Sequence, residues 1–532
     1  MAFTNLQMLE ALNFKNPGRS LLVLSLLLLS AGLPLSPFLV GASQFFLLLS
    51  WFIEGDFKNK WQRLKSNRVL HVFLILPLLH VLWLFNTSDY AYALHDIKIK
   101  LPLLVFPILL GTTNPITKKE LNLILAVFVL AVFSGTMVTM SILTGVYPYH
   151  YTDIREASIF ISHIRFGLMI AFVLVVLGKF ITEALHLNQK NKALALSALF
   201  IWMLFFLVIL QSVTSWVILF FLVFFLFFFY YKQITKAFLK IAGWLVLILL
   251  VVGTSTLFGV LIYNFYFKET IAFNELPNKT PRGNLYLNDT TTRTKENGHY
   301  VRVLISYKEL GQTWPTLSQI PFNGKDANGY SIWATMIRYL TSKGLPKDQD
   351  GLLALEPEDI QMIEKGFASC VYRSKFIPYI KAYSILWELD RYFKSGDANN
   401  KSVAQRIEYL KAAGHLISKH FWFGVGTGDL NNDYKKAFAE INSRLHPENQ
   451  HRAHNQYLTF FVAFGIFGFM LALSSMFLPL IWQGNKHNLM LISFVFITFI
   501  SMLNEDTLET QAGVSFYIFF YTLLLFSSSN KK

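Results

Sequence analysis

The chain has 532 residues, of which 54% are hydrophobic and only 15% are charged. A soluble domain carries about 25% charged residues, so this composition excludes an ordinary soluble protein. The formal net charge of +15 is better explained by basic residues that flank membrane spans than by a nucleic-acid partner. Cys370 is the only cysteine, which excludes a disulfide framework and a thiolate metal site.

Long apolar runs predict an all-α polytopic membrane protein. A bilayer core about 30 Å thick needs about 20 apolar residues per helix, and the runs at 201–231 and 241–263 are long enough. The first run, 21–29, lacks a clear small-residue cleavage site, so we interpret it as a retained helix and not as a signal peptide. In chain order, about twelve spans are expected near residues 19–34, 36–53, 68–86, 98–111, 121–145, 158–178, 193–210, 212–231, 238–263, 454–482, 488–503 and 511–528.

The connectors between these spans alternate in charge. The positive-inside rule therefore predicts that both termini lie in the cytoplasm and that the long polar segment 264–453 lies outside. This segment would follow nine spans in residues 1–263 and precede three spans in residues 454–532. Basic residues gather at both termini and in the connectors at 58–68, 118–119, 179–192 and 232–240.

The outer segment is predicted to be a partly helical loop domain. It opens with the turn-rich stretch "NELPNKTPRGNLYLNDTTTRTKENG". Helical patches follow at 330–343, 358–368 and 403–419, and in the last of these the apolar residues fall at helical spacing.

His454 stands at the predicted outer end of the tenth span. A helix N-terminus presents free N–H groups and a positive dipole end, which favour a neutral imidazole. A neutral histidine at pH 7 can act as a general base, although a solvated interfacial histidine explains the position alone equally well. The neighbouring His446, Glu448 and His451 match no standard zinc spacing, so we predict no metal site.

The stretch "FGVGTGDL" places Gly424, Gly426 and Gly428 before Asp429. Its spacing does not match a dinucleotide-binding loop, and no Walker A motif occurs in the chain, so no nucleotide cofactor is expected. We predict instead a tight turn that holds the ends of two helices.

Gly465 and Gly468 lie one helical turn apart within the tenth predicted span. Small residues let membrane helices approach closely, so we expect both glycines to serve helix packing and not catalysis.

Two arginines stand out. Arg165 is predicted to lie about 10 Å inside the sixth span, where an arginine costs roughly 2.5–3.5 kcal/mol and needs compensation. Glu505 or Asp506 would be a structural partner, whereas a phosphate would be a functional one because guanidinium binds phosphate in a bidentate fork. Arg406 precedes "GVGTGD" and is a second candidate, although a solvated helix face explains it equally well.

The stretch "HNQYLTFFVAFGIFGF" consists of H-N, nine residues and G-x-x-G, and it resembles the signature of the O-antigen ligase and polymerase superfamily. "QRIEYLKAAGHLISKHFWFGVGTGD" is similar to the helix and glycine turn that precede this signature. "SHIRF" and "NEDTLETQAGVSFYIFF" resemble segments of Bacteroidetes-type members. The resemblance covers the whole expected topology.

This resemblance implies a glycosyltransferase of the bacterial inner membrane that works at the periplasmic face without metal or cofactor. It would move a glycan from an undecaprenyl diphosphate carrier to an acceptor hydroxyl, which belongs to lipid A-core in ligases and to another carrier-linked glycan in polymerases. The implied general base is His454. The implied diphosphate ligands are Arg165 and Arg406, and Arg452 is a further candidate for this role. The structural motif comprises Asn455, Gly465, Gly468, Gly424, Gly426, Gly428 and Asp429.

One feature departs from the family pattern. Many members carry an arginine near the outer end of the eighth span, where this chain has Gln211, Ser212 and Thr214. One expected phosphate contact is therefore missing or is supplied elsewhere, by Arg452 or Arg155.

The residue types also fit this chemistry without the family resemblance. A sugar diphosphate is already activated, so transfer needs one base for the acceptor hydroxyl and arginines for the departing diphosphate, and a single displacement inverts the anomeric centre. A polymerase, a protein O-oligosaccharyltransferase and a non-enzymatic polysaccharide transporter remain as alternatives. A transporter would tend to show broken helices and ionisable groups at the membrane midplane, whereas these spans are expected to be mostly uninterrupted.

Overall fold

The computed structural model describes residues 16–151, 153–268, 271–482 and 488–527. The chain forms two compact units. Unit 1 comprises Met1–Thr235 and Ser395–Lys532, and unit 2 comprises Lys236–Lys394. The predicted outer segment, 264–453, is thus divided between the two units, and its placement outside the membrane stays a prediction.

Unit 1 contains helices from both ends of the chain. Its N-terminal part holds α2 (Pro17–Leu35), α3 (Pro37–Glu54), α4 (Phe57–Ser66), α5 (Arg68–Leu82), α6 (Tyr90–Lys100), α7 (Pro102–Thr112), α8 (Lys118–Leu143), α9 (His163–His186), α10 (Lys190–Ile209) and α11 (Val213–Tyr230). Its C-terminal part holds α18 (Ser402–Lys419), α19 (Leu430–Glu440), α20 (Gln456–Trp482), α21 (Leu489–Ser501) and α22 (Gln511–Phe526).

Several helices of unit 1 begin where the sequence supplies a cap. The side chains of Asn16 and Ser36 accept backbone N–H groups in the first turns of α2 and α3, and each helix also starts with a proline. Thr117 and Glu120 form a capping box at the start of α8. These local signals fix where the apolar helices start.

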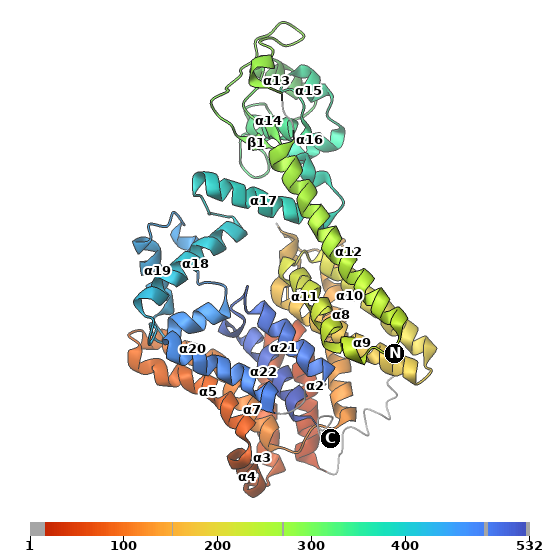
Figure 1. Ribbon diagram of the computed structural model, residues 1–532, viewed down its shortest axis with the longest axis vertical. Helices are drawn as coiled ribbons and strands as arrows, with labels where there is room; N and C mark the ends of the chain where they lie inside the picture. Colours follow the sequence, from red (N-terminus) through yellow and green to blue (C-terminus); the bar gives the residue numbers. More distant parts are fainter. Residues whose placement is uncertain (1–15, 152, 269–270, 483–487, 528–532) are drawn as a thin grey trace. The chain divides into compact units, whose positions relative to one another are not determined.

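The two parts of unit 1 share one core. Helix α22 is buried continuously from Gly513 to Leu525 and packs against α2, α7 and α21. Helix α20 packs along α5, and α21 packs against α9. Figure 1 shows these C-terminal helices in blue beside the red and orange N-terminal ones. Segments on either side of unit 2 in the sequence therefore fold as a single body.

Nine helices in the described residues are long and apolar enough to cross a membrane: α2, α3, α5 with its 3-10 extension to Asn86, α8, α9, α10, α11, α12 (Ala237–Ile262) with its extension to Phe267, and α20. Helices α21 and α22 are also apolar but shorter. The prediction of an all-α polytopic membrane protein is confirmed, while the number of twelve spans stays a prediction.

Three boundaries differ from the sequence prediction. The expected span at 98–111 is interrupted because α6 ends at Lys100 and α7 starts at Pro102, whose missing N–H suits the first position of a helix. Helix α9 starts at His163, five residues later than expected, because residues 158–162 are not helical. Helix α20 is broken at Gly465, where φ is 61° and ψ is −170°.

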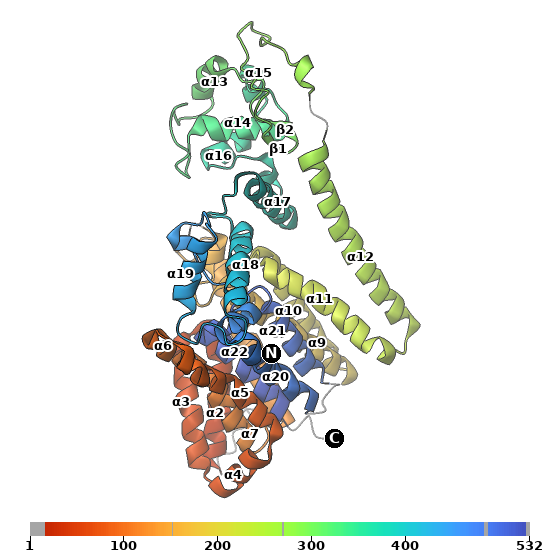
Figure 2. The same cartoon turned by 60° about the vertical axis from the view of Figure 1, so that its left-hand side comes forward.

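Unit 2 contains α12, the two-residue strands β1 (Lys295–Glu296) and β2 (His299–Tyr300), α13 (Tyr307–Thr313), α14 (Ile332–Lys343), α15 (Gln349–Leu353), α16 (Pro357–Glu364) and most of α17 (Ile377–Ser395). The strands form an antiparallel hairpin whose turn residues Asn297 and Gly298 both have positive φ. Figure 2 shows the short helices α13 to α16 gathered around this hairpin. Trp314 and Tyr339 are fully buried in their shared core.

Candidate active site

His454 lies directly before α20 with a left-handed backbone, at φ 47°. Few residues other than glycine adopt this conformation, and such residues concentrate at functional sites. The next residue, Asn455, fixes the turn from both sides. Its Oδ1 accepts the N–H of Leu458 at 3.1 Å, and its Nδ2 donates to the carbonyl of Leu503 at 2.9 Å. Asn455 therefore caps α20 and ties it to the loop between α21 and α22.

The imidazole of His454 is half-buried and carries no hydrogen bond to any described residue. Its ring centroid lies 5.6 Å from that of Tyr409 and 6.2 Å from that of His451. Burial lowers the pKa of His454 from 6.5 to about 4, and the positive charges of Arg406 and Arg165 act in the same direction, as does His451. The ring is neutral at pH 7 and able to accept a proton. Its neutrality, predicted from the helix end, arises chiefly from burial.

A polar pocket of about 400 Å³ opens beside His454. Its walls come from α19, from the segment before α20 and from the loop between α21 and α22. The lining residues are Asn431, Tyr434, Lys435, Gln450, His451, Arg452, His454, Asp506 and Glu509.

Arg165 is the third residue of α9 and therefore lies only about 3 Å along the helix, not 10 Å as predicted. Its Nη1 donates to Ser162 Oγ at 3.3 Å, while its Nε is buried and has no hydrogen-bond partner among the described residues. Neither Glu505 nor Asp506, the structural partners considered, forms an ion pair with it within the described ranges. Most of its donor capacity is unused.

Arg406 lies on α18 and is held by the loop between α21 and α22. Its Nη1 donates to Asn504 Oδ1 at 2.6 Å, and its Nη2 lies 3.4 Å from Glu505 Oε1. Asn504 Nδ2 in turn donates to Thr214 Oγ1 at 2.8 Å at the start of α11. Thr214 belongs to the stretch that departs from the family pattern, so this stretch joins the arginine network through Asn504.

Glu505 is a weak counter-ion for Arg406. Burial raises its pKa from 4.5 to about 7, although the neighbouring Arg406 and Arg165 oppose this shift. Near pH 7 its carboxyl group is therefore partly protonated, and it neutralises the charge of Arg406 only in part. Nothing in the sequence pattern singled out Asn504 or Glu505 as a partner of Arg406, which lies about 100 residues earlier in the chain.

Arg452 is engaged by the protein itself. Its Nη1 donates to Glu509 Oε2 at 2.7 Å, its Nε donates to Asn431 Oδ1 at 2.9 Å, and its guanidinium hydrogen-bonds and stacks on Tyr92. Glu509 also accepts from Lys100 Nζ at 3.0 Å. Although burial opposes ionisation, Lys100 and Arg452 lower the pKa of Glu509. Arg452 is thus neutralised by a carboxylate, unlike Arg165. Arg155, the other substitute considered, pairs with Asp153 at 2.5 Å.

The "GVGTGD" stretch forms a tight turn against the break in α20. Gly424 and Gly426 have φ of 68° and 96°, and the N–H of Gly426 donates to the carbonyl of Ala463 at 2.9 Å. A Cβ on Gly424 would lie 2.4 Å from that carbonyl, and one on Gly465 would lie 2.3 Å from the carbonyl of Trp422. Only glycine permits this close approach of two backbones.

The same turn is also fixed to the start of α6. Asp429 accepts the N–H of Ser88 at 2.7 Å and the N–H of Asp89 at 2.9 Å. Gly428 packs directly on the carbonyl of Asp89, and Gly468 packs on the ring of Trp83. The turn's polar groups are used by the chain, so it holds helices in place, as expected.

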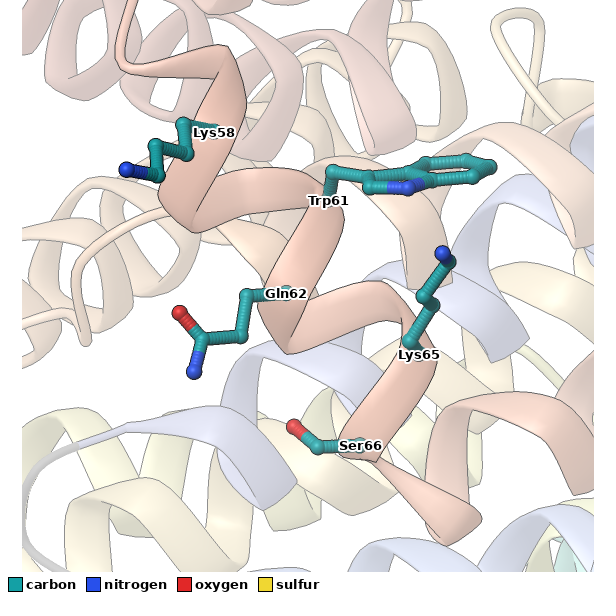
Figure 3. A pocket seen from close by; sticks show the side chains of 5 residues that line it. All are labelled: Lys58, Trp61, Gln62, Lys65 and Ser66. Carbon is teal, nitrogen blue, oxygen red and sulfur yellow. The ribbon is translucent and has the colours of Figure 1, made fainter.

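Two further features lie apart from this site. No group of three or more His, Cys, Asp or Glu in the described residues has an arrangement that could hold a metal ion, and His446 only approaches Glu448 at 3.8 Å. A second depression, of about 420 Å³, is lined by residues of α4 alone: Lys58, Trp61, Gln62, Lys65 and Ser66 (Figure 3). It shares no residue with the pocket beside His454.

Comparison with known families identifies the C-terminal part of this arrangement. Residues 362–473 match a family model described as O-antigen ligase. The matched range contains α18, the "GVGTGD" turn, α19, His454 and the first part of α20. No curated protein matches the chain. The match confirms the resemblance indicated by the motifs, and residues 362–473 are thus similar to the O-antigen ligase family.

Proposed function

We propose that this protein is a membrane glycosyltransferase that moves a glycan from undecaprenyl diphosphate to an acceptor hydroxyl, with His454 as the general base. The family domain and the apolar helices support a membrane protein of the ligase or polymerase type. The proposal rests on one observation: the neutral, unpartnered ring of His454 lies in a polar pocket and within electrostatic reach of Arg165 and Arg406.

The reaction would proceed as a single displacement. The acceptor oxygen attacks the anomeric carbon of the donor sugar and forms the new C–O bond. The bond between that carbon and the diphosphate oxygen breaks, and its electron pair leaves with the diphosphate. The acceptor proton passes to a ring nitrogen of His454. The anomeric centre is inverted, and the diphosphate needs no general acid because it is a weak base.

Arg165 and Arg406 would hold the diphosphate and stabilise the charge that it gains. A guanidinium can bind phosphate oxygens through two parallel hydrogen bonds, and Arg165 has unused donors for this purpose. Arg406 would exchange its 3.4 Å contact with Glu505 for the phosphate. Arg452, which is paired with Glu509, would shape the site and not bind the donor directly.

The predicted topology completes the proposal. With both termini in the cytoplasm, His454 would face the periplasm of a bacterial inner membrane, where lipid-linked glycans and their acceptors meet. A polymerase that uses a second carrier-linked glycan as acceptor fits the same residues. Transport is less well supported, because the break in α20 is closed by hydrogen bonds from the "GVGTGD" turn.

The proposal is tested with purified full-length protein in proteoliposomes. The substrates are the lipid-linked glycan and the acceptor that accumulate in a deletion strain. Transfer should need both lipids, should need no nucleotide and should survive chelation of metals. His454→Ala should reduce turnover by about 10²–10⁴-fold, the usual effect of losing a general base. His446→Ala, on a nearby ring that does not line the pocket, is the matched control and should stay close to wild type. Near-normal turnover by His454→Ala would refute the proposal.

A further inference from the structure

His454 has two different surroundings. Arg165 and Arg406 influence its ring electrostatically, yet neither of them lines the pocket that His454 borders. Among the described residues, the arginine side carries two guanidinium groups and the weakly paired carboxyl group of Glu505, while Asp506 of the pocket also acts on Arg165 electrostatically. An anionic diphosphate therefore fits the arginine side, and the pocket is left without an assigned ligand.

The charges of the pocket are balanced. Arg452 is paired with Glu509 at 2.7 Å, and the pocket further contains one lysine, Lys435, and one carboxyl group, Asp506. A diphosphate would lie against two carboxyl groups there, and like charges in close contact disfavour binding. The remaining lining consists of amide, hydroxyl and imidazole groups. Such groups suit an uncharged ligand that both donates and accepts hydrogen bonds.

One lining group is poorly satisfied. The side chain of Tyr434 is 2% exposed, and its buried hydroxyl forms no well-aligned hydrogen bond with a described residue, although the backbone N–H of Ala453 lies near it. Buried polar groups in native proteins are nearly always hydrogen-bonded, so a poorly satisfied one in a pocket wall points to a ligand that completes it. Arg165 Nε, on the arginine side of His454, has no hydrogen-bond partner among the described residues.

We infer that this pocket binds the terminal sugar of the acceptor glycan and presents its hydroxyl group to His454. The inference rests on the proposed function, in which the diphosphate lies on Arg165 and Arg406. The volume of about 400 Å³ is at the small end of small-molecule sites, which suits the end of a glycan and not its length. Tyr434 and Lys435 hydrogen-bond the sugar from α19.

The placement agrees with the geometry of displacement. The attacking oxygen and the leaving diphosphate must lie on opposite faces of the anomeric carbon. His454 borders the acceptor pocket and is also influenced by the charges of Arg165 and Arg406. It can therefore take the proton from the attacking hydroxyl while the diphosphate departs.

The test measures KM for donor and acceptor separately in the full-length protein. The donor is the lipid-linked glycan from a deletion strain, and the acceptor is the unmodified glycolipid from the same strain. Tyr434→Phe and Lys435→Ala should each raise the acceptor KM by about three- to tenfold, the effect of one lost hydrogen bond, and leave the donor KM unchanged. Lys436→Ala is the matched control, because Lys436 follows Lys435 but pairs with Asp433 outside the pocket.

A thermal unfolding measurement separates recognition from folding. Tyr434→Phe removes a hydroxyl that forms no well-aligned hydrogen bond in the protein, so its Tm should stay close to that of the wild type. An unchanged acceptor KM in Tyr434→Phe and Lys435→Ala, or a raised donor KM instead, would overturn the inference. These KM values are measured in variants that still transfer the glycan. Failure of the proposed function would give a different result, namely normal glycan transfer by His454→Ala.

Discussion

The "GVGTGD" turn and the surroundings of His454 lie in the same unit, and both contain residues with left-handed backbones. In the turn, the chain itself satisfies the polar groups: Gly426 donates to α20, and Asp429 accepts from the start of α6. Around His454, the imidazole and Arg165 Nε have no hydrogen-bond partner in the described part of the chain, and the Tyr434 hydroxyl forms no well-aligned hydrogen bond there.

Under the proposed function, this difference separates groups that stabilise the fold from groups that bind a ligand. A satisfied buried hydrogen bond adds about 1 kcal/mol to stability, whereas an unsatisfied buried group costs about 1–3 kcal/mol. Substitutions in the turn should therefore reduce the amount of folded protein. Substitutions around His454 should reduce turnover and leave folding intact.

The largest effect is expected in the turn. Gly465→Ala places a Cβ 2.3 Å from the backbone of Trp422 at a positive φ, and should destabilise the protein by about 3 kcal/mol or more. The amount of folded protein in membranes and its Tm measure this. Gly414→Ala is the control, because its Cβ would meet nothing within 4 Å and an alanine favours the helix. Equal abundance of both variants in membranes would contradict the conclusion that the turn stabilises the fold.

Arg165 tests the other side of the comparison. Arg165→Ala should lower turnover by about 10²–10³-fold, the usual effect of losing a donor to a developing anion, while abundance is retained. Arg165→Lys should recover little, since lysine lacks the planar fork. Arg155→Ala, in a pair with Asp153, should transfer normally. Full activity of the lysine variant would leave only a charge role for Arg165.

A smaller effect is expected at Glu505, whose pKa is raised to about 7 by burial. Below pH 7 its carboxyl is neutral and leaves Arg406 free, and above pH 7 it is ionised and competes with the donor diphosphate. The donor KM should therefore rise as the pH increases through 7. Glu505→Gln should flatten this dependence and lower the donor KM at pH 8 by about two- to fivefold. A pH dependence identical in both proteins would exclude the competition.

Much of this arrangement could be predicted from the sequence. Long apolar runs indicated the helices, and the spacing of H-N and G-x-x-G indicated the family whose model matches residues 362–473. Local signals failed where a distant segment decides the outcome. The break at Gly465 depends on pairing with a turn about 40 residues earlier, and the contacts of Arg406 come from a loop about 100 residues later. The poorly satisfied hydroxyl of Tyr434 is likewise a property of packing, which no sequence pattern indicates.

The central claim is that the chain keeps the ring of His454 neutral and unpartnered so that it can act as a base. The most direct measurement is the pH dependence of kcat/KM, which reports the free enzyme, made in the Glu505→Gln variant so that Glu505 does not titrate. Because burial and the nearby cations lower the pKa of His454 to about 4, activity should be limited by this base only near pH 4. Asp506, with a pKa raised to about 6 by burial, is tested in parallel as Asp506→Asn. A half-maximal rate near pH 6.5 that survives Asp506→Asn would mean an ordinary solvated histidine and would contradict the claim.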